Sequence, residues 1–136
     1  MTADEQYAQN MATLAGHGAE EIRRIPSQLA NVPLVNLQLM PNAHGDIVGA
    51  AWSQAQQQWI GLCDGDDPLG QAERGVESMY SPAVRVFTIC GLGLGYAAAA
   101  LAKRLKPYQR LSIWELSPAL YKAMFSCLDV TPLFSD

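Results

Sequence analysis

The sequence predicts an α/β fold in which a parallel strand–helix–strand unit follows a small antiparallel β meander and N-terminal helices. Residues 84–90 form an apolar, β-rich run that leads directly into three alternating glycines. The alanine-rich residues 96–106 are strong helix formers, and a second apolar run covers residues 110–115. Because strand, helix and strand follow one another in this order, we expect the two strands to be adjacent and parallel, joined by the helix.

Helices are expected at the N-terminus. Thr2 and Glu5 fit a capping box, which predicts a helix over about residues 3–15. A second short helix is expected over residues 19–29, bent or split by Pro26. We therefore interpret the start of the chain as a helical segment.

A change of periodicity marks the meander. Between residues 34 and 63, apolar residues recur with a period near two in three short runs. The runs are separated by turn-forming or polar residues, so three antiparallel strands are expected.

An acidic loop follows the meander. Asp67 and Pro68 suit the N-cap and the first position of a helix that ends near Tyr80. The acids at Asp64 and Asp66 do not follow the spacing of an EF-hand. The loop is therefore interpreted as a capping loop, and no metal site is expected.

The glycine-rich turn is the main candidate for a binding site. Gly91, Gly93 and Gly95 lie between the predicted strand and helix, where backbone N–H groups and the positive end of a helix dipole meet. Glu115 ends the next strand, 20 residues after Gly95. In a βαβ unit such an acid lies beside the turn and can accept hydrogen bonds from ribose hydroxyls. These residues predict a pocket for a nucleotide-type small molecule.

The spacing of the glycines reduces the number of ligand classes that fit this turn. A dinucleotide fingerprint would require a glycine at position 96, where this chain has Tyr96. Gly91, Gly93 and Gly95 instead match the G-x-G-x-G turn of class I methyltransferases that bind S-adenosylmethionine, although Ile89 stands where those enzymes usually carry an acid. Tyr96 either covers a bound sugar or base or packs at the start of the helix. A third alternative is that the glycine turn binds no ligand.

Composition excludes several classes of function. The chain has 136 residues, of which 49% are hydrophobic and 16% charged, so a globular domain is expected. The net charge of −4 and the lack of a basic patch argue against nucleic acid as a partner. Because there is neither an apolar stretch of about 18 residues nor a signal peptide, we expect no membrane association and a cytoplasmic location. The three dispersed cysteines predict no structural zinc.

A resemblance to a known protein family supports the prediction of a nucleotide-type pocket. The meander followed by Asp67–Arg74 and Gly91–Tyr96 resembles the front portion of motility accessory factor proteins. The run Ile113–Pro118 is similar to the same proteins and to related spore-maturation glycosyltransferase-like proteins. The resemblance covers about residues 34–136. It implies a Rossmann-like domain and nucleotide-sugar chemistry in the full-length family, whose remaining catalytic portion would lie outside this chain.

Together these observations predict a domain organisation and a function. We divide the chain into an N-terminal helical segment (1–31), a small antiparallel β meander (32–66) and a partial Rossmann-like nucleotide-binding domain (67–136). The expected function is that of a nucleotide-type ligand-binding front domain of a glycosyltransferase-like protein, not catalytically complete alone. The alternatives are a fragment of an S-adenosylmethionine-dependent methyltransferase and a non-catalytic interaction module. The ligand is thus expected to be a nucleotide-sugar or S-adenosylmethionine. Any enzyme would be a transferase, and catalytic residues are unassigned.

A homodimer is also expected. In a doubly wound sheet the first strand has neighbours on both sides, and the strand at 84–90 lacks one of them in this sequence. An open edge beside apolar side chains recruits another strand, here from a second copy. The apolar face predicted at this edge comprises Val84, Val86, Phe87 and Ile89.

Overall fold

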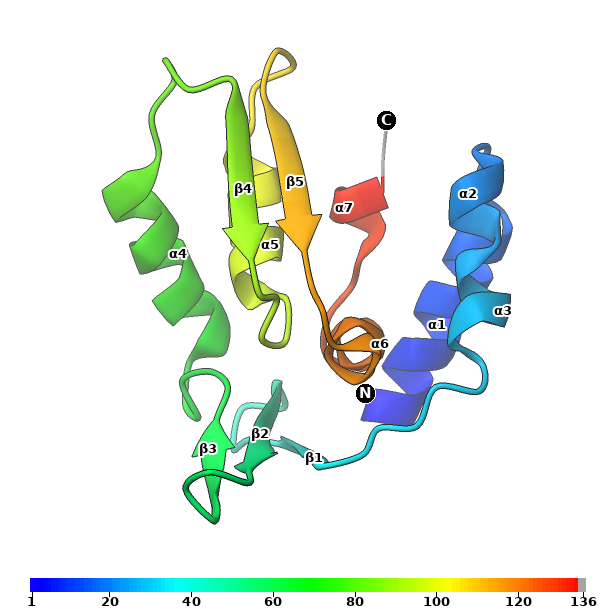
Figure 1. Cartoon of the computed structure of the whole chain (residues 1–136). Coiled ribbons are helices and arrows are strands. Elements are labelled where there is room, and N and C mark those ends of the chain that lie inside the picture. The colour runs from blue at the N-terminus through cyan, green and yellow to red at the C-terminus, as the bar shows by residue number, and fades with distance from the viewer. Residues whose placement is uncertain (135–136) are drawn as a thin grey trace.

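The computed structural model describes residues 1–134 and has a mixed α/β architecture (Figure 1). Its helices and strands, in chain order, are α1 (Ala3–Ala15), α2 (Glu20–Arg23), α3 (Ile25–Leu29), β1 (Leu37–Pro41), β2 (Ile47–Ser53), β3 (Gln58–Gly61), α4 (Pro68–Met79), β4 (Val86–Cys90), α5 (Tyr96–Arg104), β5 (Arg110–Trp114), α6 (Pro118–Cys127) and α7 (Thr131–Phe134). Within the described residues, no helix combines the length and the hydrophobicity needed to cross a membrane.

The strands form two separate sheets. β1, β2 and β3 make an antiparallel meander, and β4 pairs with β5 in parallel, with Thr88 opposite Ser112. α5 connects the two parallel strands, and it lies with α4 behind them in Figure 1. The predictions of a meander and of a parallel pair joined by a helix are confirmed.

Several predicted boundaries are corrected. The helix predicted over 19–29 is split, one of the two outcomes expected from Pro26, into the short helices α2 and α3, and Pro26 lies in the first turn of the second. α5 ends at Arg104 rather than at residue 106, because Leu105 already has an extended backbone with ψ of 136°. α7 was not expected. It follows Asp129, whose carboxylate accepts hydrogen bonds from the N–H and the hydroxyl of Thr131.

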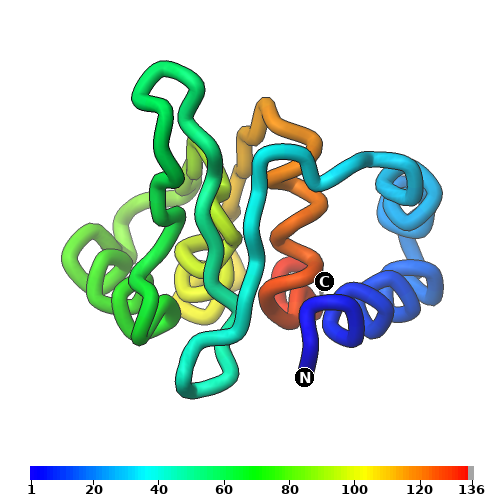
Figure 2. Tube along the Cα trace, turned by 90° about the horizontal axis from the view of Figure 1, so that it is seen from below, coloured from blue at the N-terminus to red at the C-terminus, as the bar shows by residue number. Residues whose placement is uncertain are grey.

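The meander covers one end of the helices that follow the parallel strands. Figure 2 shows it running across that end of α5 and α6. Ile47 of β2 packs in one cluster with Leu94, Tyr96 and Cys127, which belong to the glycine turn, α5 and α6. The meander therefore helps to fix the glycine turn.

The N-terminal helices share a core with the parallel unit. Leu14 of α1 lies in one buried cluster with Leu92 of the glycine turn, Ala98 of α5 and Phe125 of α6. The three segments distinguished in the sequence thus pack against one another, and the division into domains stays an interpretation.

One feature predicted for β4 is wrong. The side chains of a strand alternate between its two faces, so Val84, Val86, Phe87 and Ile89 do not share one face. Phe87 is buried in a cluster with residues of α4 and α5. Val86 lies on the opposite face and is 55% exposed, and Trp114 of β5 is 63% exposed. The open face of the β4–β5 sheet therefore carries fewer apolar side chains than predicted.

The homodimer stays a prediction. Within the described residues, β4 pairs only with β5, and the meander is a separate sheet that does not extend this pair. We expect the open edge to recruit a second copy, with light scattering at micromolar concentration giving the mass of a dimer. A mass that stays that of a monomer at every concentration would contradict the prediction.

Candidate ligand-binding site

The backbone of the turn between β4 and α5 requires its three glycines. Gly91, Gly93 and Gly95 have φ angles of +88°, +57° and +90°. L-residues rarely adopt such positive values, because the side-chain Cβ then crowds the backbone. The three glycines singled out in the sequence therefore determine the path of the chain from the strand into the helix.

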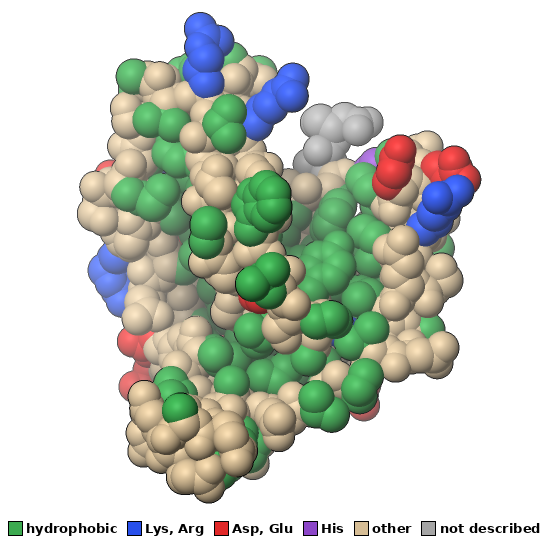
Figure 3. Space-filling model, in the orientation of Figure 1, with side chains coloured by type: hydrophobic (Ala, Val, Ile, Leu, Met, Phe, Trp, Pro, Cys, Tyr) green, Lys and Arg blue, Asp and Glu red, His purple; other side chains and the backbone are tan. Residues whose placement is uncertain are grey.

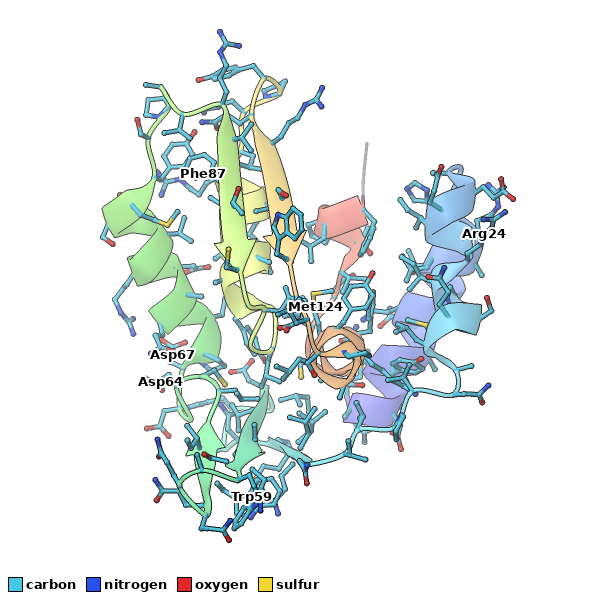
Figure 4. The ribbon with its side chains drawn as sticks, in the orientation of Figure 1. Arg24, Trp59, Asp64, Asp67, Phe87 and Met124 are labelled. Atoms are coloured by element: carbon cyan, nitrogen blue, oxygen red, sulfur yellow. The ribbon has the colours of Figure 1, made fainter. Side chains whose placement is uncertain are left out.

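The three glycines have different surroundings. A Cβ at Gly95 would overlap Met124 Cγ of α6 and lie 3.0 Å from its Sδ. Figure 4 labels Met124 at this end of the β4–β5 sheet. A Cβ at Gly93 would lie 3.4 Å from the carbonyl oxygen of Leu62, whereas a Cβ at Gly91 would meet no atom within 4 Å. Gly95 is thus needed for helix packing, and Gly91 is the glycine beside open space.

Glu115 lies directly beside this turn. Its Oε1 accepts a hydrogen bond of 2.8 Å from the N–H of Leu92, and its Oε2 accepts one of 3.0 Å from the N–H of Ser117. The carboxylate therefore connects the turn after β4 to the turn after β5. Each carboxylate oxygen has a second lone pair, so it can accept a further hydrogen bond from a ligand hydroxyl.

Tyr96 has a packing role in this structure. Its side chain is buried, and its hydroxyl donates a hydrogen bond of 2.6 Å to the carbonyl oxygen of Ile47 in β2. The same hydroxyl lies 3.4 Å from the carbonyl oxygen of Cys127. Burial raises the pKa of Tyr96 far above its ordinary value, so the hydroxyl keeps its proton. Of the two roles left open by the sequence, packing at the start of the helix is the one observed.

Two cavities adjoin the turn. The Glu115 cavity, of about 430 Å³, is lined by Leu92, Leu111, Ile113, Glu115, Tyr121, Met124, Leu133 and Phe134. The α4 cavity, of about 380 Å³, is lined by Leu62, Cys63, Pro68, Gln71, Ala72, Gly75, Val76, Met79, Leu92, Leu94, Tyr96 and Ala97. Figure 3 shows hydrophobic side chains lining a hollow between the β4–β5 sheet and the helices opposite it. Both volumes lie in the range of small-molecule pockets.

Sequence reasoning missed most of the residues that line the Glu115 cavity. Tyr121 lies in a helix that was expected, but its position in a cavity has no local signal. Its ring packs edge to face on Phe125, and burial raises the pKa of its hydroxyl. Leu133 and Phe134 belong to α7, which was not predicted.

Asp64 and Asp67 of the loop between β3 and α4 accept hydrogen bonds from backbone N–H groups, which agrees with the predicted capping loop. Asp64 Oδ1 accepts hydrogen bonds of 2.8 and 2.9 Å from the N–H groups of Asp66 and Asp67. The bond from Asp67 is the main cause of the lowered pKa of Asp64. Asp67 in turn caps α4 by accepting from the N–H of Gly70, and Figure 4 labels both acids in this loop.

Comparisons with known protein families, with curated proteins and with solved structures found no match to this chain.

Proposed function

We propose that this chain binds a nucleotide-type small molecule beside the glycine turn, as the front domain of a glycosyltransferase-like protein. One observation carries the proposal: the carboxylate of Glu115 at the end of β5 accepts a hydrogen bond from Leu92 in the turn after β4. In sheets of parallel strands, ligands bind beyond the carboxyl ends of the strands, and an acid in this position binds ribose. The parallel pair would then be part of a Rossmann-like domain that is not catalytically complete alone.

The Glu115 cavity suits a nucleoside. Glu115 is its acceptor for ribose hydroxyls, and Tyr121 and Phe134 offer aromatic surface for a base. The remaining lining is apolar, which favours a flat, weakly polar group over a free sugar.

A second candidate ligand is S-adenosylmethionine. The G-x-G-x-G spacing favours it, and all three glycines adopt the left-handed backbone conformation that such a turn needs. The resemblance to motility accessory factor proteins favours a nucleotide-sugar. In either case the chain would belong to a transferase, and the non-catalytic interaction module is the alternative if no ligand binds.

The variant Gly91→Ala tests the site. A Cβ at Gly91 would point into open space beside the turn, where the ligand would approach, so we expect the affinity to fall about tenfold, or about 1.4 kcal/mol. Isothermal titration calorimetry with S-adenosylhomocysteine, UDP-N-acetylglucosamine and GDP-mannose would measure the change. The wild-type protein should give a binding heat with at least one of them.

Gly45→Ala is a matched control. Gly45 has a φ of +87°, against +88° for Gly91, and a Cβ there also meets no atom within 4 Å. Both variants should therefore lose a similar free energy of unfolding, about 1–2 kcal/mol, but only Gly91→Ala should lose ligand affinity. If the folded wild-type protein gives no heat with any of the ligands, the binding function is wrong and the interaction module is the remaining function.

A further inference from the structure

We propose that the ligand of this site is a nucleoside whose 5′ substituent is uncharged or cationic, as in S-adenosylmethionine, and not a nucleoside phosphate or a nucleotide-sugar. This inference rests on the nucleotide-type site of the proposed function, and of the two candidate ligands named there it selects S-adenosylmethionine over a nucleotide-sugar. It follows from the charges around the glycine turn and from the apolar surroundings of the N-terminal end of α5.

The first step concerns cations. A nucleotide-sugar carries a diphosphate, which proteins hold with Arg, Lys, a metal ion or exposed N–H groups at the start of a helix. Among the described residues that line the Glu115 cavity and the α4 cavity, Glu115 is the only charged one, and there is no lysine or arginine. The Glu115 carboxylate repels a phosphate at short range and attracts a cation.

Two basic side chains on the neighbouring helices, those of Lys122 and Arg104, have other partners. Lys122 of α6 donates a hydrogen bond of 2.8 Å to the carbonyl oxygen of Val32, and its Nζ lies 5.4 Å from the centre of the Tyr7 ring. Arg104 lies at the C-terminal end of α5, the end away from the turn, and pairs with Glu77 of α4. Neither side chain is placed to neutralise a phosphate beside Gly91.

The second step concerns the start of α5, which in dinucleotide-binding proteins holds the pyrophosphate. Here Leu94 and Tyr96 are only 2% and 8% exposed, because the meander covers them. A Cβ at Gly49 of β2 would lie 3.2 Å from Leu94 Cδ1, which shows how closely β2 approaches the turn. On the α6 side, Met124 fills the space next to Gly95. The start of α5 therefore faces the α4 cavity, whose described lining has no charged side chain to balance a pyrophosphate.

The Glu115 cavity is open on the other side of the turn, where Leu92 and Glu115 both line it. This cavity offers carboxylate oxygens for ribose hydroxyls, and the rest of its lining is aromatic and aliphatic. These groups bind the base and the ribose of a nucleoside, and they favour a neutral or positively charged 5′ group over a phosphate.

Matched ligand pairs test this inference. Calorimetry at low ionic strength would compare 5′-methylthioadenosine with AMP, which share the base and the ribose and differ only in the 5′ group. The pairs uridine and UMP, cytidine and CMP, and guanosine and GMP cover the other bases. In each pair that binds, we expect the phosphate-free member to bind at least about tenfold more tightly, and we expect the difference to shrink as salt screens the charges.

The variant Glu115→Gln gives a second readout. A glutamine keeps a carbonyl oxygen that can accept from Leu92, but it removes the negative charge. Loss of a ribose contact weakens both members of a pair equally, so the ratio of their affinities reports the charge alone. We expect this ratio to fall in Glu115→Gln, with the fold checked by its unfolding transition.

The outcomes separate this inference from the proposed function. If the phosphate member of a pair, or UDP-N-acetylglucosamine, binds more tightly, the inference is overturned while the nucleotide-type site stands. An affinity ratio that does not change in Glu115→Gln also overturns it, since the carboxylate would then not set the preference. If no compound binds the folded protein, the proposed function fails, and the inference fails with it.

Discussion

Gly95→Ala is expected to lower the free energy of unfolding by about 2–5 kcal/mol. A φ of +90° costs an L-residue about 1–2 kcal/mol. The new methyl group would also overlap Met124 Cγ in a closely packed region, and such overpacking costs about 1–3 kcal/mol more. Urea denaturation followed by tryptophan fluorescence would measure the change.

Two further variants separate these contributions. Gly91→Ala has the backbone strain without the overlap, so it should lose only about 1–2 kcal/mol. In a Met124→Ala background the overlap disappears, and Gly95→Ala should there have the same smaller effect. If the effect of Gly95→Ala is the same in both backgrounds, contact with α6 is not its cause.

The sequence predicted those parts of the site that depend on residues close to one another along the chain. The strand, the glycine turn and the helix each have a local pattern, and the parallel pairing of β4 with β5 follows from their order. The approach of Glu115 to the turn follows from that pairing, because both groups lie at the carboxyl ends of adjacent strands.

Contacts between distant segments were not predictable in this way. The Tyr96 hydroxyl bonds to Ile47, 49 residues earlier in the chain, and a tyrosine at the start of a helix does not show which carbonyl it will reach. α7 has only four residues, which is too short for a helical period to be seen. Both features help to decide which space beside the turn is open.

Gln109 explains another difference between the prediction and the structure. Its Nε2 donates to the carbonyl oxygens of Ser81 and Val84, and its Oε1 accepts from Lys106 N–H and the Tyr80 hydroxyl. Three of these bonds, to Tyr80, Ser81 and Val84, hold the chain before β4 as a loop. The strand therefore begins at Val86, two residues later than its apolar run.

Asn10→Ala is expected to destabilise the protein by at least about 3 kcal/mol. Asn10 is buried in the middle of α1, and its Nδ2 donates to the carbonyl oxygens of Phe125 and Leu128 at 2.7 and 2.8 Å. Its Oδ1 accepts a bond of 3.3 Å from the N–H of Val130. Alanine would leave these groups at the end of α6 without partners in a dry environment, at about 1–3 kcal/mol for each unsatisfied group.

Thr13→Ala is the control on the same helix. The Thr13 hydroxyl donates to the carbonyl oxygen of Gln9 on the exposed side, so its removal should change the free energy of unfolding by no more than about 0.5 kcal/mol. Equal effects of Asn10→Ala and Thr13→Ala in urea denaturation would show that the junction of α1 and α6 does not depend on Asn10.

Asn10→Asp tests the direction of the hydrogen bonds at nearly constant size. A carboxylate cannot donate to the Phe125 and Leu128 carbonyl oxygens, whereas a protonated carboxyl supplies one donor. Burial beside two carbonyl oxygens would raise the pKa of this aspartate in the folded state above its ordinary value of about 4. The folded state then binds more protons than the unfolded state, so the stability deficit relative to wild type should be smallest below about pH 4 and grow as the pH rises. A deficit that stays constant between pH 4 and pH 7 would mean that the two carbonyl oxygens do not require a donor at this position.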